Sequence, residues 1–274
     1  MTRIVAVKMM GDWSRRSRTS ALVRQISPNF SKALANYFGT GPTDINASIQ
    51  THNKYVDILK ENGLDVTILP SLAEYPDSCF VEDAVVIVGS AVVICNLGHP
   101  SRQGEAESIE ESLSQHLETI VMPKGATLDG GDVVFYDDCF LIGRSTRTNF
   151  EGVEFIEKIC HERGFKTFVF DIPSSTLHLS TICSSPAPGT LVTAEGHLRP
   201  EQFGGITAEI IWVPKEESYA ANTIGFENGR VIVSDGYPRT VELLTQHGFS
   251  VTTLDMEHIR CADGSLTCLR LFFK

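Results

Sequence analysis

Two residues that together could carry out covalent hydrolysis stand far apart in this chain of 274 residues: Cys268 near the C-terminus and His178 in the segment 174-SSTLHLSTICSS-185. A thiolate is a good nucleophile, and an imidazole can protonate a leaving amine and then deprotonate water, because its ordinary pKa lies near neutrality. Either residue alone is more often a packing residue of the core. The pair predicts a cysteine hydrolase if the fold brings the two together.

Acidic residues cluster before an apolar run in the segment 75-YPDSCFVEDAVVIV-88, where Asp77, Glu82 and Asp83 occur. Acids this dense beside an apolar strand must be solvated, paired, or waiting for a cation. A guanidinium group suits them, because its planar fork of donors matches carboxylates bidentately. The segment therefore indicates a cationic substrate of the guanidine class.

A second acidic segment, 126-ATLDGGDVVF-135, has two carboxylates that flank Gly130 and Gly131. The glycines permit a sharp backbone turn next to a strand. Asp129 could orient His178 and favour its imidazolium form. A plain β-turn is the alternative if the motif acts alone.

Arginines recur after similar strand–glycine phrases, as Arg102, Arg147, Arg199 and Arg239. Arg102 and Arg147 could hold a substrate carboxylate, whereas a surface arginine that closes each unit explains all four equally well. The sequence contains no HxxxH pair, no Cys/His quartet and no phosphate-binding loop. Covalent catalysis without a metal or cofactor is therefore predicted.

The elements that must position these residues repeat along the chain. Helix-like stretches end before Gly63, Gly164 and Gly248, and each glycine is followed by a strand: GLDVTIL, GFKTFVF and GFSVTTL. The strand–glycine–arginine phrase recurs at steps of 45, 53 and 40 residues. Apolar stripes predict helices over residues 45–59 and 103–118. These repeats predict about five units, each made of strands and a helix. We expect the units to form a closed ring in which the last strand of the chain pairs with the first.

Equal offsets from the glycines suggest which polar residues meet on the ring axis. Asp77 lies 14 residues after Gly63, and His178 lies 14 after Gly164. Asp83 and Cys268 each lie 20 residues after their glycines. The prediction is that these side chains converge. An open α/β sheet with coincidental turns is the competing interpretation.

Composition narrows the class of partner. Apolar residues make up 42% of the chain, and the formal charge of −11 disfavours nucleic acids, which require a basic face. No apolar run approaches a membrane span, and the seven cysteines contain no CxxC pair, which favours a reduced, cytoplasmic chain. An N-terminal strand and surface arm are expected over residues 1–20, rather than a transit peptide.

Eight motifs in chain order resemble the dimethylarginine dimethylaminohydrolase family of the guanidino-modifying (pentein) superfamily. They are YPDSCFVED, SRQGE, LDGGD, GRSTRTN, LHL, ESYAAN, GYPRT and DGSLTC. The resemblance runs from about Ala21 to the C-terminus. It implies one α/β propeller domain with five-fold pseudo-symmetry over residues 1–274, and hydrolysis of Nω-methylated arginines to citrulline and methylamines. It leaves open a homodimer.

The resemblance also implies roles for individual residues. Cys268 would form a covalent thiouronium with the guanidinium carbon, His178 would act as acid and base, and Asp129 would support it. Substrate contacts are implied for Glu82 and Asp83 at the guanidinium, Asp77 near the amino-acid end or the substrate core, Arg102 and Arg147 at the α-carboxylate, and Leu34 as a lid in the segment 27–42.

Two positions depart from the family pattern. Ser180 stands where relatives carry lysine and where arginine deiminases carry an aspartate, so it leaves room for methyl groups; Ala262 replaces a branched apolar residue and could alter the pocket. Alternatives remain a relative acting on arginine, citrulline or another guanidine or ureido compound, and a non-catalytic propeller used as a binding module.

Overall fold

The computed structural model describes residues 13–16 and 18–274, so the strand expected near the N-terminus lies largely outside the described residues. The strands are β1 Ser20–Arg24, β2 Asp65–Leu69, β3 Val85–Val88, β4 Ala91–Ile94, β5 Glu118–Val121, β6 Val133–Tyr136, β7 Cys139–Arg144, β8 Lys166–Asp171, β9 Cys183–Ala187, β10 Thr190–Ala194, β11 Glu209–Val213, β12 Ile224–Gly225, β13 Arg230–Ser234, β14 Ser250–Leu254 and β15 Leu271–Phe273. The α-helices are α1 Ile45–Glu61, α2 Val81–Ala84, α3 Glu107–Leu113, α4 Phe150–Glu162, α5 Leu179–Ile182, α6 Pro238–Gln246 and α7 Glu257–Arg260. The 3₁₀ helices are η1 Trp13–Arg16, η2 Phe30–Lys32, η3 Pro100–Arg102, η4 Gly130–Asp132, η5 Pro200–Phe203, η6 Lys215–Ala221 and η7 Thr267–Leu269.

Five three-stranded sheets form the predicted five-fold α/β propeller. Four of them run in chain order: β3-β4-β5, β6-β7-β8, β9-β10-β11 and β12-β13-β14. In every sheet the first strand is antiparallel to the middle one, and the outer strand is parallel to the middle one. A parallel pair needs a crossover connection, which α1, α3, α4, α6 or η5 supplies.

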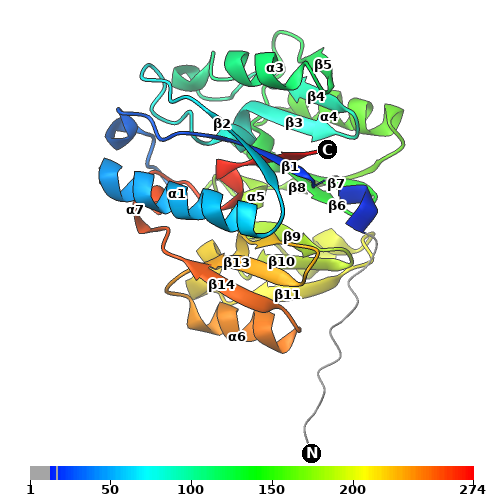
Figure 1. Ribbon diagram of the computed structural model, residues 1–274. Coiled ribbons are helices and arrows are strands. Elements are labelled where there is room, and N and C mark those ends of the chain that lie inside the picture. The colour runs from blue at the N-terminus through cyan, green and yellow to red at the C-terminus, as the bar shows by residue number, and fades with distance from the viewer. Residues whose placement is uncertain (1–12, 17) are drawn as a thin grey trace, which may run out of the picture.

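The fifth sheet closes the ring, as the sequence predicted. β15 pairs antiparallel with β1, with Ser20 opposite Phe273, and β1 pairs in parallel with β2. Figure 1 shows the red C-terminal segment beside β1. The closure joins the two ends of the chain within one sheet, while the outer strands, such as β2 and β5, remain sheet edges.

The helix-closing glycines have the conformation expected of them. Gly63, Gly164 and Gly248 have φ of 85°, 79° and 89°, in the left-handed region that follows α1, α4 and α6. The helix expected over residues 103–118 extends only over Glu107–Leu113, although its apolar stripe is buried. Ile49, expected on the buried stripe of α1, is instead 39% exposed.

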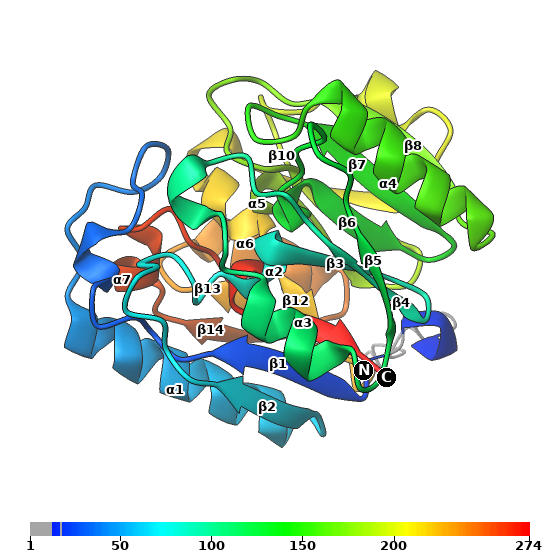
Figure 2. The same cartoon turned by 90° about the horizontal axis from the view of Figure 1, so that it is seen from above.

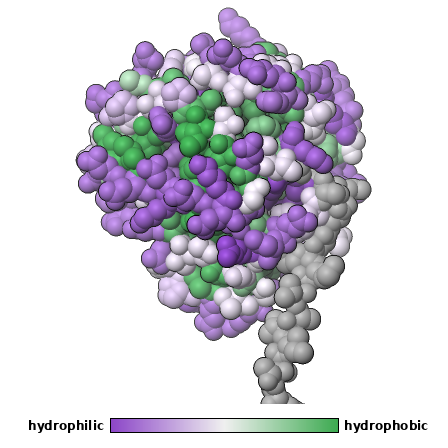
Figure 3. Space-filling model, in the orientation of Figure 1, coloured by the Kyte–Doolittle hydropathy of each residue, from purple (hydrophilic) through white to green (hydrophobic). Residues whose placement is uncertain are grey.

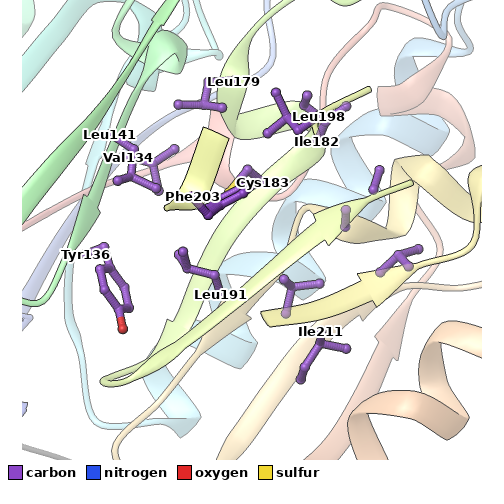
Figure 4. Packing of buried hydrophobic residues seen from close by; sticks show 14 of the residues in the cluster. Val134, Tyr136, Leu141, Leu179, Ile182, Cys183, Leu191, Leu198, Phe203 and Ile211 are labelled. Carbon is purple, nitrogen blue, oxygen red and sulfur yellow. The ribbon is translucent and has the colours of Figure 1, made fainter. Parts of the chain in front are cut away.

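Apolar packing between neighbouring sheets fixes the ring. One cluster combines residues of strands β6 to β11 and of β13, and Figure 4 labels ten of them, among them Leu141, Ile182, Leu191 and Ile211. Helix α1 adds Tyr55 and Leu59 to a second cluster. In Figure 2, α1 and α4 lie at the periphery with α2 and α5 between them. The short helices thus lie inside the ring.

The face of the molecule in Figure 3 is largely hydrophilic, with hydrophobic side chains gathered in its upper half. In the described part of the chain, no helix is long and apolar enough to cross a membrane. The seven cysteines are all free thiols, and six of them are buried.

Candidate active site

Short helices immediately before the innermost strands carry the candidate catalytic residues. Asp83 lies in α2, Asp129 precedes η4, His178 precedes α5 and Cys268 lies in η7. The leucines on either side of His178 and the apolar run after Cys268 suggest strands at both residues, and this prediction is wrong, because each sheet begins only after its short helix. Since every unit places this helix at the same end of its sheet, side chains from distant units meet near the axis.

The equal offset of Asp77 and His178 does not reflect equivalent positions. Helices α2 and α5 each have four residues and lead directly into β3 and β9, so Phe80, the residue before α2, corresponds to His178. The loop before α2 is longer than the offset assumed. Asp77 instead accepts a hydrogen bond from the backbone N–H of Leu34 at 3.1 Å.

The imidazole of His178 is 1% exposed and lies between two carboxylates. Its Nε2 is 3.0 Å from Asp129 Oδ2, and its Nδ1 is 3.6 Å from Asp83 Oδ1. Nδ1 is buried and has no hydrogen-bond partner among the described residues. A Cβ at Gly131 would approach Nδ1 to 2.6 Å, so only glycine allows this arrangement. The predicted pairing of Asp129 with His178 is therefore present in the structure.

This surrounding charge favours the imidazolium form. Burial lowers the pKa of His178, but the carboxylates of Asp83, Asp129 and Asp132 outweigh burial and raise the pKa to about 9. Burial raises the pKa of Asp129, and the hydrogen bond and charge of His178 reverse this and lower it. At neutral pH the ring therefore carries a proton that it can donate through Nδ1.

The thiol of Cys268 is buried, at 3% exposed, and its Sγ lies 3.2 Å from Ser265 Oγ. Burial raises its pKa, and the negative charges of Glu82 and Asp83 raise it further. Asp83 thus acts electrostatically on both Cys268 and His178. Without a cation nearby the sulfur is a neutral thiol, and a bound guanidinium would favour the thiolate.

The three acids of the first acidic segment have different partners. Asp83 accepts from Arg102 at 2.5 Å and from the N–H of Gly131 at 3.2 Å. Burial raises the pKa of both Asp77 and Glu82. Of the three, Asp83 is the carboxylate that the structure brings into contact with His178.

Glu82 was expected at the guanidinium, but its carboxylate binds side chains on the opposite side of α2. It accepts from Ser180 Oγ at 3.1 Å, Thr267 Oγ1 at 2.8 Å and the guanidinium of Arg270 at 3.1 Å. Asn222 in turn donates to Ser180 O and to Thr267 Oγ1. Arg270 thus supplies the cation that pairs with Glu82.

The four recurring arginines divide into two pairs. Arg199 and Arg239 are exposed, as the surface interpretation expected. Arg102 is 3% exposed, and it binds Glu105 and Asp83 besides the carbonyls of Asp77 and Phe80. Arg147 lies 3.3 Å from Asp129 Oδ2 and its side chain is 10% exposed. Arg102 thus has several protein partners, and Arg147 is the more accessible of the two.

The loop over residues 27–42, expected as a lid, is docked against the turn at Asp263. The Asp263 carboxylate accepts from the backbone N–H groups of Asn36, Tyr37 and Gly39. Leu34 is half-buried in this loop, and Ala262 is buried in the same apolar cluster as Cys268. Asp263 itself has a φ of 59°, so the turn presents its carboxylate from a left-handed backbone.

In the described part of the chain, one group of side chains is close enough together to bind a metal ion, although the sequence contains no metal-binding motif. Ligand atoms of Asp83, Asp129 and His178 lie within 4.8 Å of one another. Both carboxylates already accept hydrogen bonds, from Arg102 and Gly131 on one and from Arg147 and Gly98 on the other. A metal ion there would displace these donors, so the two carboxylates are better suited to hold the imidazolium of His178 than to bind a metal.

Sequence reasoning missed Arg270, Asn222 and Thr267 around Glu82. One signal was available, because Arg270 interrupts the apolar terminal run LTCLRLFF and a charge in such a run requires a partner. It gave no role to Asp132, the second carboxylate beside the glycines, which accepts from Ser145, Thr148 and the N–H of Leu179. Burial raises the pKa of Asp132 to about 6.

Comparison with known proteins gives a consistent result. A family model described as N,N dimethylarginine dimethylhydrolase, eukaryotic, matches residues 37–199. The N(G),N(G)-dimethylarginine dimethylaminohydrolase of Pseudomonas aeruginosa is 35% identical, covering 85% of this chain and 91% of that protein. Its namesake from Streptomyces coelicolor is 28% identical, covering 91% and 95%.

Solved structures extend the comparison to the fold. A mutant of the Pseudomonas aeruginosa enzyme in complex with citrulline superposes with a TM-score of 0.86 at 32% identity, covering 93% of this chain and 99% of that one. An amidinotransferase from Microseira wollei superposes with a TM-score of 0.81 at 15% identity, covering 94% of each chain, and shows the shared fold.

Proposed function

This chain belongs to the dimethylarginine dimethylaminohydrolase family, and from that premise we propose that it hydrolyses Nω-methylated arginines to citrulline and mono- or dimethylamine. The observation that carries the proposal is the buried imidazole of His178 between Asp83 and Asp129, with Cys268 affected by the same Asp83 charge. A guanidino amino acid is the substrate class.

Substrate binding activates the nucleophile. A guanidinium placed against Asp83 brings a positive charge to Cys268, whose thiol is kept neutral by burial and by the acids. The thiol then loses its proton to solvent, and the thiolate attacks the guanidinium carbon. Arg147 is the candidate for the substrate's α-carboxylate, and Arg102, with its protein partners, positions Asp83 and remains a candidate for the same carboxylate.

His178 then acts first as an acid and afterwards as a base. Its Nδ1 proton passes to the methylated nitrogen as the C–N bond breaks, the amine leaves, and a thiouronium remains on Cys268. Water attacks this carbon while Nδ1 takes up one water proton. The C–S bond then breaks with its electron pair returning to the Cys268 sulfur, and the remaining hydroxyl proton leaves to solvent to give the ureido group of citrulline. Asp129 holds the ring through Nε2 at 3.0 Å during both steps.

The preference for methylated over plain arginine is proposed to depend on Ser180. Deiminases carry a carboxylate at this position, whereas the Ser180 hydroxyl is directed to Glu82 at 3.1 Å, on the side of α5 away from His178, and so offers the substrate no acceptor. Plain arginine would bury N–H donors with poor acceptors, at a cost of about 1–3 kcal/mol. Methylated arginine should therefore win on kcat/KM by at least about tenfold.

A substrate panel tests the proposal. Asymmetric dimethylarginine, monomethylarginine, arginine and agmatine are incubated with the enzyme, and citrulline, or the ureido product of agmatine, is measured along with the released amine. Dimethylarginine should give equal amounts of citrulline and dimethylamine. If the parent enzyme prefers plain arginine, the proposal is wrong and the chain is an arginine deiminase.

The nucleophile is tested by Cys268→Ser, which should abolish turnover and leave the circular dichroism spectrum unchanged, because a hydroxyl is far less acidic than a thiol. Activity within about tenfold of the parent would contradict the mechanism. In His178→Gly, mass spectrometry should reveal a covalent adduct on Cys268, since the second step lacks its base.

A further inference from the structure

A cavity of about 150 Å³ lies among the innermost strands of the ring. Its lining includes residues from the innermost strand of each of the five sheets, β3, β6, β9, β12 and β15. Glu82, Ser180 and Thr267 also line it, whereas their neighbours Asp83 and Cys268 belong to the candidate active site. The short helices therefore present one set of side chains to the site and another to this cavity.

We call this cavity the basic chamber, defined by Arg16, Arg18 and Arg270 in its lining. Glu82 is the one acidic residue in the lining formed by the described residues, so three cations face one anion. This excess of positive charge occurs in a chain whose formal charge is −11. Glu82 pairs with Arg270, and Arg16 pairs with Asp137 outside the lining, so Arg18 is the cation of the three that has no ion pair among the described residues. A charge without a partner is costly to bury, so the chamber favours an anion.

Two buried donors of the chamber lack partners. Nε of Arg16 and Nε of Arg270 have no hydrogen-bond partner among the described residues, and the Arg16 side chain is 1% exposed. The other nitrogens of Arg16 bind Ser185 and Asp137, which fixes its guanidinium. Arg18 and Arg270 lie over the ring of Phe272, at 4.9 and 4.7 Å from its centre. The cations are therefore held in place before a ligand arrives.

Electrostatics agree with this geometry. Burial lowers the pKa of Arg16 to about 10, although Asp137 opposes the shift. Burial, and then the charges of Arg16 and Arg270, lower the pKa of Arg18. An anion among the three guanidinium groups would relieve this mutual repulsion.

From these observations we propose that the basic chamber binds a small oxyanion of the phosphate class. Guanidinium groups bind such oxygens through paired donors, and the chamber adds the hydroxyls of Ser185 and Thr223 at its wall. At roughly 10–15 Å³ for each water, its volume holds on the order of ten waters, enough for an oxyanion with part of its hydration shell.

Calorimetric titration of the full chain with inorganic phosphate, at constant ionic strength, tests the proposal. The expected result is one saturable site, weakened about tenfold or more in Arg16→Gln, because a charged hydrogen-bond donor is lost. Sulfate should compete with phosphate, acetate should compete more weakly, and chloride should not compete. A crystal soaked in sulfate should show the anion within hydrogen-bond distance of Arg16 or Arg270.

Two controls separate this site from the active site. Citrulline should leave phosphate binding unchanged, and so should Arg147→Gln, which alters an arginine at the other site. If Arg16→Gln does not fold by circular dichroism, Arg18→Gln takes its place. The proposal is overturned if the parent chain binds no phosphate, if citrulline displaces it, or if the folded chamber variant binds it as the parent does.

Discussion

Replacing Asp129 by asparagine should remove the negative charge beside His178 while a side chain of the same shape stays in contact with the ring. Asp129 Oδ1 accepts the N–H of Gly98 at 2.7 Å, and Oδ2 accepts from His178 at 3.0 Å. An asparagine that keeps the Gly98 bond with its oxygen turns its NH₂ group toward His178 Nε2. A donor there requires an unprotonated Nε2, so the variant favours the neutral imidazole.

The magnitude follows from the pKa of His178, which lies at about 9 rather than the ordinary 6.5. That shift corresponds to about 3 kcal/mol in favour of the imidazolium, and the loss of Asp129 should remove at least about 1.4 kcal/mol, or one pKa unit. Because a neutral imidazole is a poor acid, kcat should fall by up to about tenfold relative to the parent at pH 9 and above, whereas at pH 7 most of the imidazolium remains and the loss is small.

The assay combines the pH profile of kcat/KM with an NMR titration of labelled histidine. In the parent enzyme activity should decline as the pH rises through the pKa of His178, and in Asp129→Asn this decline should move to lower pH. Asp129→Glu retains the charge and should retain most of the shift, and Asp171→Asn, at an exposed acid paired with Arg144, should behave as the parent. An unchanged histidine pKa in Asp129→Asn would refute the reasoning.

Four further outcomes are expected. Exhaustive chelation should leave activity unchanged, because a metal at Asp83 and Asp129 would have to displace the donors that already bind both carboxylates. Loss of activity with rescue by a divalent ion would contradict this. His178 should contribute about 3 kcal/mol to the free energy of unfolding below about pH 6.5, lost as the pH rises through about 9, and urea titrations of His178→Gln should lack this loss. Iodoacetamide should modify Cys268 slowly at pH 7, because its raised pKa keeps the thiol protonated. The rate, measured by peptide mass spectrometry, should still be increasing at pH values above those at which an ordinary thiol is fully ionised. Rapid labelling at pH 7 would mean that the thiolate is already formed. Ser180→Asp should narrow the kcat/KM gap between methylated arginine and arginine; a gap that stays constant would exclude a role for Ser180 in selectivity.

The repeated phrases of the sequence determined the architecture. Left-handed glycines after α1, α4 and α6, and the strand phrases that follow them, predicted five units and the pairing of β15 with β1. These features depend on local backbone preferences and apolar periodicity, which neighbouring residues encode. The same sequence identified the acid–base candidates by type, because few side chains combine nucleophilicity with titration near neutrality.

Contacts across the ring were decided only by the tertiary structure. Glu82 and Asp83 are adjacent in sequence, yet α2 directs Glu82 toward Arg270 and Asp83 toward His178. The arginine phrase likewise places Arg102 in a buried network and leaves Arg239 exposed. The physical reason is that the direction of a side chain in a single-turn helix, and the charges that surround it, depend on residues of other units, which lie 48 to 188 positions away in the sequence. The sequence thus determined the units and the reactive groups, and their packing around one axis decided which charges meet.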